Sequence, residues 1–220
     1  YLDMMSAYSA VSHGHAHPEL VKVFRDQSET LSLTSRAFYT NTLGPYLETI
    51  TKMTGFEMAL PMNSGAEAVE TAIKSARRWA YRSKKIEPNK AEIIVAEGNF
   101  HGRTTTIISF SSESNSKDDF GPHTPGFISV EFGSTKAVED AITDNTAAVL
   151  FEPVQGEGGI IEPPQNWLSD VRNICDKNNV LMILDEVQSG LGRTGKLFAF
   201  EHANIRPDGL ILGKALGGGF

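Results

Sequence analysis

The sequence predicts an α/β fold in which helices cover both faces of a mainly parallel sheet. From about residue 58 onward, short apolar runs of strand length alternate with longer amphipathic runs of helix length. Two of the short runs, Ala147–Glu152 and Val180–Asp185, are apolar at nearly every position. Strands of this kind are buried on both faces and are typical of parallel sheets that have helices on each side.

The expected elements follow in order along the chain. Two helices, at about Pro18–Thr30 and Gly44–Thr54, lie in a loop-rich N-terminal segment that we delimit as residues 1–57. The large domain, residues 58–220, is expected to begin with a short strand at Met58–Met62 and a helix at Ala66–Ser83 with apolar residues at helical spacing. The later expected elements are strand Glu92–Glu97, a short helix after Gly102, strand Phe127–Glu131, a helix capped by Ser134 and ending near Ile142, strand Ala147–Glu152, helix Trp167–Lys177, strand Val180–Asp185 and strand Gly209–Leu212.

The composition favours a folded protein that acts on small molecules. Apolar residues make up 40% of the chain and charged residues 21%, so a sizeable core can be buried. The net charge of −7 gives no general attraction to nucleic acids or anionic membranes. The single cysteine, Cys175, cannot form an internal disulfide, which fits a reducing compartment, and its place on the apolar face of a helix predicts a core position.

A small-residue turn, Asn63–Ala68 (NSGAEA), leads directly into the first helix of the large domain. Free backbone N–H groups and the positive end of the helix dipole allow such a turn to bind phosphate, and Gly65 lets an anion approach closely. An ordinary helix start capped by Ser64 is the alternative, and this segment alone does not exclude it.

The loop Gly98–Arg103 follows the next strand and holds an aromatic residue and a cation. Phe100 can lie flat on a planar ring, and Arg103 can bind a carboxylate through paired hydrogen bonds. Glycine-flanked loops of this composition are common, so a purely structural role explains this segment equally well.

Acidic side chains end two of the buried strands. Glu152 opens a glycine-rich loop that also holds Glu157, and these carboxylates suit either a pocket or a solvated turn. Asp185 ends the other strand, where burial is costly unless a cation such as a protonated pyridine nitrogen meets it. A metal ion is the alternative, which is disfavoured because no histidine or cysteine cluster accompanies Asp185. The alternating histidines within residues 13–17 are better explained by loop packing than as metal ligands.

Lys214 follows the last apolar strand, Gly209–Leu212, and has small residues on both sides. Burial at that point would lower the pKa of the amine and make it nucleophilic. A lone lysine is more often on the surface, but this one completes a set of four features along one sheet. The phosphate turn, the aromatic residue, the strand-end acid and the lysine are what pyridoxal 5'-phosphate requires, so we expect that cofactor.

Four motifs give the chain a likeness to a known family. They are Asn63–Ala68, Glu152–Glu157 (EPVQGE), Asp185–Gly195 (DEVQSGLGRTG) and Gly213–Leu216 (GKAL). With them, essentially the whole chain resembles the class III, or omega, aminotransferases, and within these it most resembles the members that act on ornithine. Further stretches that carry the likeness are Ser6–Val11, Gly14–Pro18, Leu33–Tyr39, Gly98–Thr104 and Phe120–Pro122.

The resemblance implies the type I fold of pyridoxal-phosphate enzymes, working as a homodimer or higher homo-oligomer with active sites at the subunit interface. Residues 1–57 would contribute to that interface and to the site. The chain begins without a methionine and stops in a glycine-rich loop, so we expect a missing C-terminal small domain.

The resemblance also assigns residues to the cofactor. Lys214 would hold it covalently, Asp185 would pair with the pyridine nitrogen and keep it protonated, and Gln188 would hydrogen-bond the ring hydroxyl. Val187 would pack against one face of the ring and Phe100 would stack on the other. The two catalytic residues in this scheme are Lys214 and Asp185.

The phosphate and the substrate would be held by other groups. Gly65 and Ala66 would donate backbone N–H groups to the phosphate. Arg103 would bind a substrate carboxylate, Tyr8 would line the substrate pocket, and Glu157 would form a reversible pair with an arginine beyond the end of this chain.

The resemblance implies that the terminal (delta) amino group of ornithine moves to 2-oxoglutarate, giving glutamate and glutamate semialdehyde, which cyclises to pyrroline-5-carboxylate. An omega-aminotransferase for acetylornithine or 4-aminobutyrate is the nearest alternative, although Tyr8 and Ser35–Tyr39 favour ornithine. His101 stands where the ornithine enzymes commonly have tryptophan, so we expect it in a substrate pocket of different shape.

Two alternatives come from other classes of protein. A non-catalytic paralogue is disfavoured because Lys214, Asp185 and Gln188 are all present. A nucleotide-binding module is disfavoured because the first strand–helix turn lacks the glycine patterns of such modules. No partner in nucleic acid or membrane is expected, and we expect the cytoplasm as the compartment, with the mitochondrial matrix as the alternative.

Overall fold

The computed structural model describes residues 1–35 and 37–220, so Arg36, within the predicted motif Ser35–Tyr39, lies outside the described residues. The described chain divides into two compact units. The larger unit joins Tyr1–Ser12 to Asn63–Phe220, and the smaller unit is His13–Met62. This division differs from the predicted boundary after residue 57, because the first twelve residues group with the large unit.

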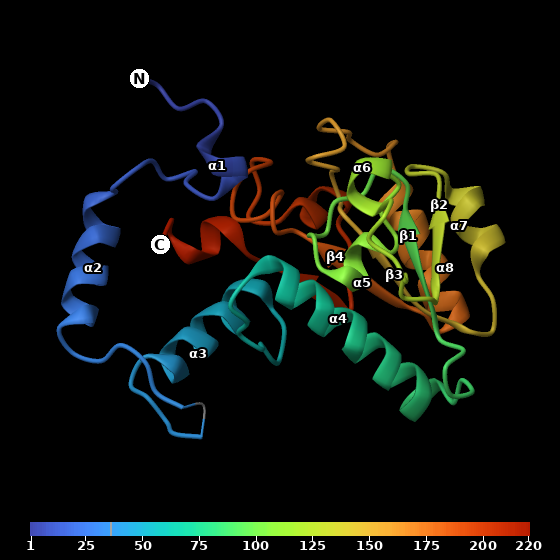
Figure 1. Cartoon of the computed structure of the whole chain (residues 1–220), viewed down its shortest axis with the longest axis horizontal. Helices are drawn as coiled ribbons and strands as arrows, with labels where there is room; N and C mark the ends of the chain where they lie inside the picture. The colour runs from blue at the N-terminus through green and yellow to red at the C-terminus, as the bar shows by residue number, and fades with distance from the viewer. Residues whose placement is uncertain (36) are drawn as a thin grey trace. The chain divides into compact units, whose positions relative to one another are not determined.

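The larger unit is built on one five-stranded sheet, and all of its strands are parallel. The strands lie in the order β2-β1-β3-β4-β5 (Figure 1 labels the first four). The chain therefore runs from β1 to the edge strand β2 and then crosses back to the other side of β1 to form β3. Their bounds are Glu92–Ala96 for β1, Phe127–Val130 for β2, Thr146–Phe151 for β3, Leu181–Asp185 for β4 and Gly209–Ile211 for β5. The predicted parallel sheet is therefore confirmed, strand by strand, from Glu92 onward.

Helices cover both faces of the sheet, as predicted. Alternate residues of the central strands point to opposite faces of the sheet, so a strand that is apolar throughout contributes side chains to the core on each face. On one face, Val149 and Met182 pack with α7 (Thr135–Ala141) and α8 (Trp167–Asn178). On the other face, Leu150 and Ile183 pack with α4 (Gly65–Trp79) and α5 (Thr105–Ile108). Cys175 of α8 is fully buried in the first core, which confirms its predicted place.

Two helices begin at the serine caps that the sequence suggests. The Ser64 hydroxyl accepts from the Glu67 N–H at 3.2 Å at the start of α4, and the Ser134 hydroxyl accepts from the Ala137 N–H at 3.2 Å at the start of α7. Each bond satisfies one of the N–H groups that a helix start leaves unpaired. The remaining elements of the larger unit are α1 (Ser6–Ser9), the π-helical turn η1 (Ala80–Lys84), α6 (Ser114–Lys117), and the 3₁₀ turns η2 (Ala199–Ala203) and η3 (Lys214–Gly217).

The smaller unit holds the two predicted N-terminal helices, α2 (Pro18–Ser28) and α3 (Leu43–Thr54), which ends at Gly55 in the left-handed conformation. The strand predicted at Met58–Met62 is wrong, because this segment forms no strand. Its methionine and leucine side chains are exposed, with 85% of Met58 accessible, and Pro61 has no N–H for a sheet ladder. Within the described residues, no helix is long and apolar enough to cross a membrane.

Candidate active site

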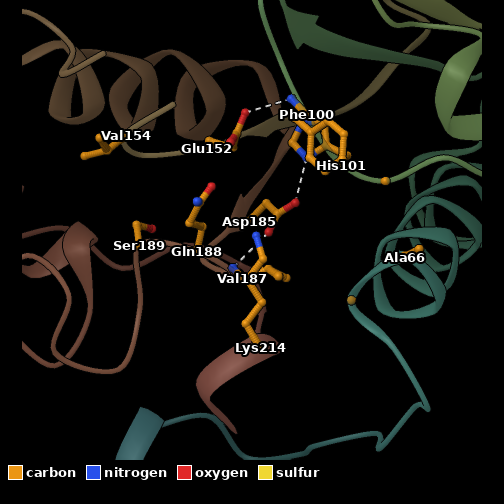
Figure 2. A pocket seen from close by; sticks show the side chains of 12 residues that line it. Ala66, Phe100, His101, Glu152, Val154, Asp185, Val187, Gln188, Ser189 and Lys214 are labelled. Atoms are coloured by element: carbon orange, nitrogen blue, oxygen red, sulfur yellow. Dashed lines mark hydrogen bonds and ion pairs between the residues drawn. The ribbon is translucent and has the colours of Figure 1, made fainter. Parts of the chain in front are cut away.

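A cavity of about 200 Å³ opens at the carboxyl ends of the strands, where parallel sheets bind their ligands. Loops that follow β1, β3, β4 and β5 all contribute to its walls, together with the first residues of α4 (Figure 2). The lining residues are Gly65, Ala66, Phe100, His101, Gly102, Glu152, Val154, Asp185, Val187, Gln188, Ser189 and Lys214. Every predicted cofactor-binding residue is therefore gathered around one cavity.

The start of α4 lines the cavity with its first two residues, Gly65 and Ala66. The Ser64 cap uses the N–H of Glu67, and the carbonyl of Ser64 accepts from the N–H of Ala68. The N–H groups of the first two helical residues have no carbonyl partner within the helix, as at any helix start. They are available to an anion in the cavity, and the helix dipole favours negative charge there.

Val187 fills the space between Gly65, at the start of α4, and Gly213, in the loop after β5. A Cβ atom on Gly65 would lie 3.1 Å from Cγ1 of Val187, and one on Gly213 would lie 3.3 Å from the same atom. Gly102 approaches α4 from the other side, since a Cβ atom there would lie 2.9 Å from Cβ of Ala66. Side chains at these glycines would push the walls apart, so the small residues of the motifs set the width of the cavity.

Asp185, at the end of β4, is buried and holds two hydrogen bonds. Its Oδ1 accepts from the Val187 N–H at 3.0 Å, and its Oδ2 lies 2.7 Å from Nδ1 of His101 (Figure 2). Burial lowers the pKa of His101, but the hydrogen bond to Asp185 and the charges of Asp185 and Glu152 together raise it above its ordinary value. The imidazole therefore gives the carboxylate a partly positive neighbour.

The structure gives His101 a place that the sequence did not reveal. His101 lines the cavity, but its imidazole ring is fully buried and makes its bond to Asp185. A contact of His101 with substrate stays a prediction, and the geometry favours a role in supporting the carboxylate of Asp185. Only the folded chain brings them together, because they lie 84 residues apart.

Lys214 lies directly after β5, in a strained backbone conformation. Its φ angle is +48°, in the left-handed region that residues with a side chain rarely adopt, and such strain is common at functional sites. The side chain extends from η3 toward Asp185 and Val187 (Figure 2). Burial lowers the pKa of the Lys214 amine, and the charges of Asp185, Glu157 and Glu152 oppose this only in part. The amine is thus more readily deprotonated than an exposed lysine.

The other predicted substrate residues, Arg103, Glu157 and Tyr8, lie outside the cavity lining. Arg103 is exposed, and its guanidinium lies 5.7 Å from the centre of the Phe100 ring. Glu157 is exposed near the mouth, close enough to act on the charge of Lys214. Tyr8 is 52% exposed on α1, which contacts η3. Their predicted roles toward substrate stay predictions.

Sequence reasoning left open whether Glu152 lies at a pocket or in a solvated turn, and it missed the cavity-lining residues Val154 and Ser189; the structure buries Glu152 in the cavity wall. A signal for Glu152 was present, because it ends a fully buried strand in the same way as Asp185. Among the described residues, no group of three or more histidine, cysteine or acidic side chains is arranged to hold a metal ion.

The family model for "Aminotransferase class-III" matches residues 1–220, the whole chain. The chain belongs to the class-III aminotransferase family. Among curated relatives, ornithine aminotransferase 2 of Staphylococcus aureus (strain Mu50) is 57% identical over 219 residues, which make up 100% of this chain and 55% of that protein.

Solved structures of aminotransferases match with similar partial coverage. The ornithine aminotransferase of Toxoplasma gondii, with partial occupancy of pyridoxal phosphate at its active site, has a TM-score of 0.98 at 43% identity and covers 100% of this chain and 52% of its own. The acetylornithine aminotransferase of Elizabethkingia anophelis has a TM-score of 0.87 at 52% identity, with 100% and 54% covered. The chain thus spans about half the length of the relatives it matches.

Proposed function

We propose that the chain is the cofactor-holding part of a pyridoxal-phosphate-dependent transaminase that moves the terminal amino group of ornithine to 2-oxoglutarate. The products would be glutamate and glutamate semialdehyde, or pyrroline-5-carboxylate after cyclisation. The observation that carries the proposal is the position of Lys214, whose amine has a lowered pKa and extends toward the buried carboxylate of Asp185 in one cavity.

The residues around the cavity fit pyridoxal phosphate. The N–H groups of Gly65 and Ala66 at the start of α4 suit its phosphate, and the buried carboxylate of Asp185 suits a protonated ring nitrogen. Apolar Val187 and aromatic Phe100 offer two surfaces for a flat ring. Each chemical part of the cofactor therefore finds a matching group among residues that line one cavity.

When bound, the cofactor supplies an electron-withdrawing ring that stabilises negative charge on the reacting carbon of the substrate. The residues of the chain would do the rest. Lys214 would hold the cofactor through Nζ and, when displaced by the substrate amine, would move the proton from the reacting carbon of the substrate to the carbon of the cofactor. Asp185 would keep the ring nitrogen protonated, and Gln188 would donate its amide to the ring hydroxyl.

The choice of ornithine rests on similarity and on two predicted contacts. The ornithine aminotransferase of Staphylococcus aureus is 57% identical to this chain, and Tyr8 and Ser35–Tyr39 favour ornithine. Acetylornithine is the second candidate, because an acetylornithine aminotransferase is 52% identical and His101 departs from the tryptophan of the ornithine enzymes. Glu157 would separate the two half-reactions by pairing with an arginine beyond this chain.

We also propose a homodimer or higher homo-oligomer that completes the site, and the cytoplasm as the compartment. The family resemblance supports the first, and the single cysteine supports a reducing compartment. Neither nucleic acid nor membrane is proposed as a partner.

The proposal is tested by a panel of amino donors with the full-length protein, pyridoxal phosphate and 2-oxoglutarate. Ornithine should give glutamate and pyrroline-5-carboxylate faster than acetylornithine or 4-aminobutyrate. The Lys214→Ala variant should lose turnover and the visible absorbance of the bound cofactor. Wild-type turnover in that variant would exclude the assigned site, and faster turnover with acetylornithine would replace the proposed donor.

A further inference from the structure

The loop after β3 forms a tight hairpin whose two ends pair with each other. The Gln155 N–H donates to the Ile161 carbonyl at 3.0 Å, and the Ile161 N–H donates to the Gln155 carbonyl at 2.9 Å. The amide of Gln155 also donates to the carbonyl of Glu97 at 2.7 Å. The hairpin is therefore fixed both to itself and to the loop after β1.

The buried carboxylate of Glu152, at the base of this hairpin, joins two walls of the cavity. Its Oε2 accepts from the Phe100 N–H at 3.0 Å, and its Oε1 accepts from the Gly156 N–H at 3.2 Å (Figure 2 shows the first of these bonds). One carboxylate thus holds the loop after β1, which carries Phe100, and the hairpin after β3. The site described above gives Glu152 no role.

Gly156, in turn, lies against Gln188 from the loop after β4. A Cβ atom on Gly156 would lie 1.8 Å from Oε1 and 2.5 Å from Cδ of Gln188, and its three nearest neighbours are all atoms of that side chain. The backbone of Gly156 has no positive φ that would demand glycine, and the nearest obstacle to a side chain there is the flexible end of Gln188, which a Cβ atom would displace. The position of the hairpin therefore determines where that amide can lie.

We propose that Glu152 is a positioning residue for the cofactor. One carboxylate oxygen holds Phe100 in place, the other holds Gly156, and Gly156 in turn sets the position of the Gln188 amide. The inference rests on the proposed cofactor, whose ring would lie beside Phe100 and whose hydroxyl would meet Gln188. It assigns to one buried acid the alignment of two groups that come from different strand ends.

The ionised carboxylate is the form that suits this role. Both of its oxygens face N–H donors, so an amide, which has one accepting oxygen and one NH₂ group, can satisfy only one of them. Burial, together with the charge of Asp185, raises the pKa of Glu152 above its ordinary value, and the charge of His101 and the two backbone hydrogen bonds offset this only in part. An uncharged replacement of the same shape therefore separates the bonding role from simple packing.

The first test replaces Glu152 by glutamine in the full-length protein. Glu152→Gln should weaken the affinity of the apoenzyme for pyridoxal phosphate roughly tenfold or more, because one buried N–H loses its acceptor. It should also shift the pH midpoint of the cofactor's visible absorbance by about 0.5 unit or more, because Gln188 is displaced from the ring hydroxyl. Glu139→Gln is the matched control, since Glu139 is exposed on α7, away from the cavity.

The second test is a double-mutant cycle between Gly156 and Gln188. Gly156→Ala alone should shift the same pH midpoint, because the new methyl group displaces the Gln188 amide. In a Gln188→Ala background, Gly156→Ala should produce no further shift, since the atoms that it would meet are gone. An equal shift in both backgrounds would overturn the link through Gly156.

The outcomes separate this inference from the proposed function. A wild-type protein that fails to bind pyridoxal phosphate would contradict the proposed function itself. A wild-type protein that binds it, together with a Glu152→Gln variant that only loses melting temperature, would leave the proposed function intact and overturn the positioning role. Loss of affinity with a shifted pH midpoint in Glu152→Gln, and no change in Glu139→Gln, would support it.

Discussion

The Nδ1 atom of His101 lies 2.7 Å from the Oδ2 atom of Asp185, and both side chains are buried. The imidazole comes from the loop after β1 and the carboxylate from the end of β4. A buried carboxylate is costly unless hydrogen bonds and positive charge meet it, and His101 supplies both to Asp185. The pair connects the loop that carries Phe100 and His101 to Asp185, the carboxylate proposed to pair with the ring nitrogen of the cofactor.

Loss of this bond should weaken cofactor binding. His101→Leu removes the donor and leaves one oxygen of Asp185 unpaired, which costs about 1.5–3 kcal/mol for a bond to a charged group. His101→Asn can keep a donor near the place of Nδ1 and should restore much of the loss. The measurement is the dissociation constant of pyridoxal phosphate from the full-length apoenzyme. Equal affinities in the wild type and His101→Leu would show that the bond has no part in holding the cofactor.

The two serine caps should differ in their effect on the site. Ser64→Ala and Ser134→Ala each remove an N-cap bond of 3.2 Å, so each should lower the free energy of unfolding by about 1 kcal/mol. Only Ser64 precedes residues that line the cavity, so only Ser64→Ala should weaken pyridoxal-phosphate binding, by several-fold. Urea unfolding and cofactor titration measure the two effects. Equal cofactor affinities in both variants would exclude the start of α4 as the phosphate site.

Local signals explain which elements could be predicted from the sequence. Ser134 starts α7 as expected, because a cap acts on the helix that it begins. The strands from Glu92 onward were found because burial on both faces leaves unbroken apolar runs. Met58–Met62 has an apolar run of strand length too, but a strand also needs a partner, and no local pattern reports whether one exists. Strand pairing is decided by the whole fold.

The candidate site shows the same limit. Asp185 and Lys214 could be assigned because each follows a strand, and the carboxyl ends of parallel strands meet at one edge. The bond of His101 to Asp185 could not be predicted, because residue spacing does not show which way a side chain in a loop points. The two hydrogen bonds to Glu152 come from the backbone N–H groups of Phe100 and Gly156. Almost every residue type has such a group, so the sequence gives no sign of these bonds.

Glu186 should make folding stability depend on pH. Its buried carboxylate accepts from the N–H groups of Ala199 at 2.7 Å and Phe200 at 2.9 Å. Burial nevertheless raises its pKa to about 7 from its ordinary value of 4.5. Between these values the folded state binds more protons than the unfolded state, so the free energy of unfolding should fall as pH rises, by up to about 3 kcal/mol.

Glu186→Gln removes this titration, so the stability difference between wild type and variant should change between pH 4.5 and 7 and then stay constant. Urea unfolding of the full-length proteins at a series of pH values measures it. A difference that is constant across this range would mean that Glu186 keeps an ordinary pKa in the folded protein.

Cys175 should be inert toward thiol reagents in the native protein. Its side chain is fully buried on α8, and burial raises the pKa of its thiol to about 12. The thiolate is the reacting form, so modification should be at least about a hundredfold slower than in urea. A chromogenic disulfide reagent gives the rate, and Cys175→Ala in the full-length protein identifies its share. Rapid native modification that disappears in Cys175→Ala would contradict this burial.

Glu157 should govern which half-reaction the full-length enzyme favours. It is exposed near the mouth of the cavity, on a hairpin fixed by the Gln155–Ile161 pair, and its charge acts on Lys214. We expect it to mask an arginine beyond this chain while ornithine reacts. Glu157→Gln keeps the shape and removes the charge, so the rate with glutamate should rise relative to that with ornithine by about tenfold, the effect of a charge pair worth 1–2 kcal/mol.

Stopped-flow measurement of each half-reaction tests this, with Glu162→Gln as the control because Glu162 is exposed on the same loop. An unchanged ratio in Glu157→Gln, or an equal change in Glu162→Gln, would show that the selectivity lies elsewhere.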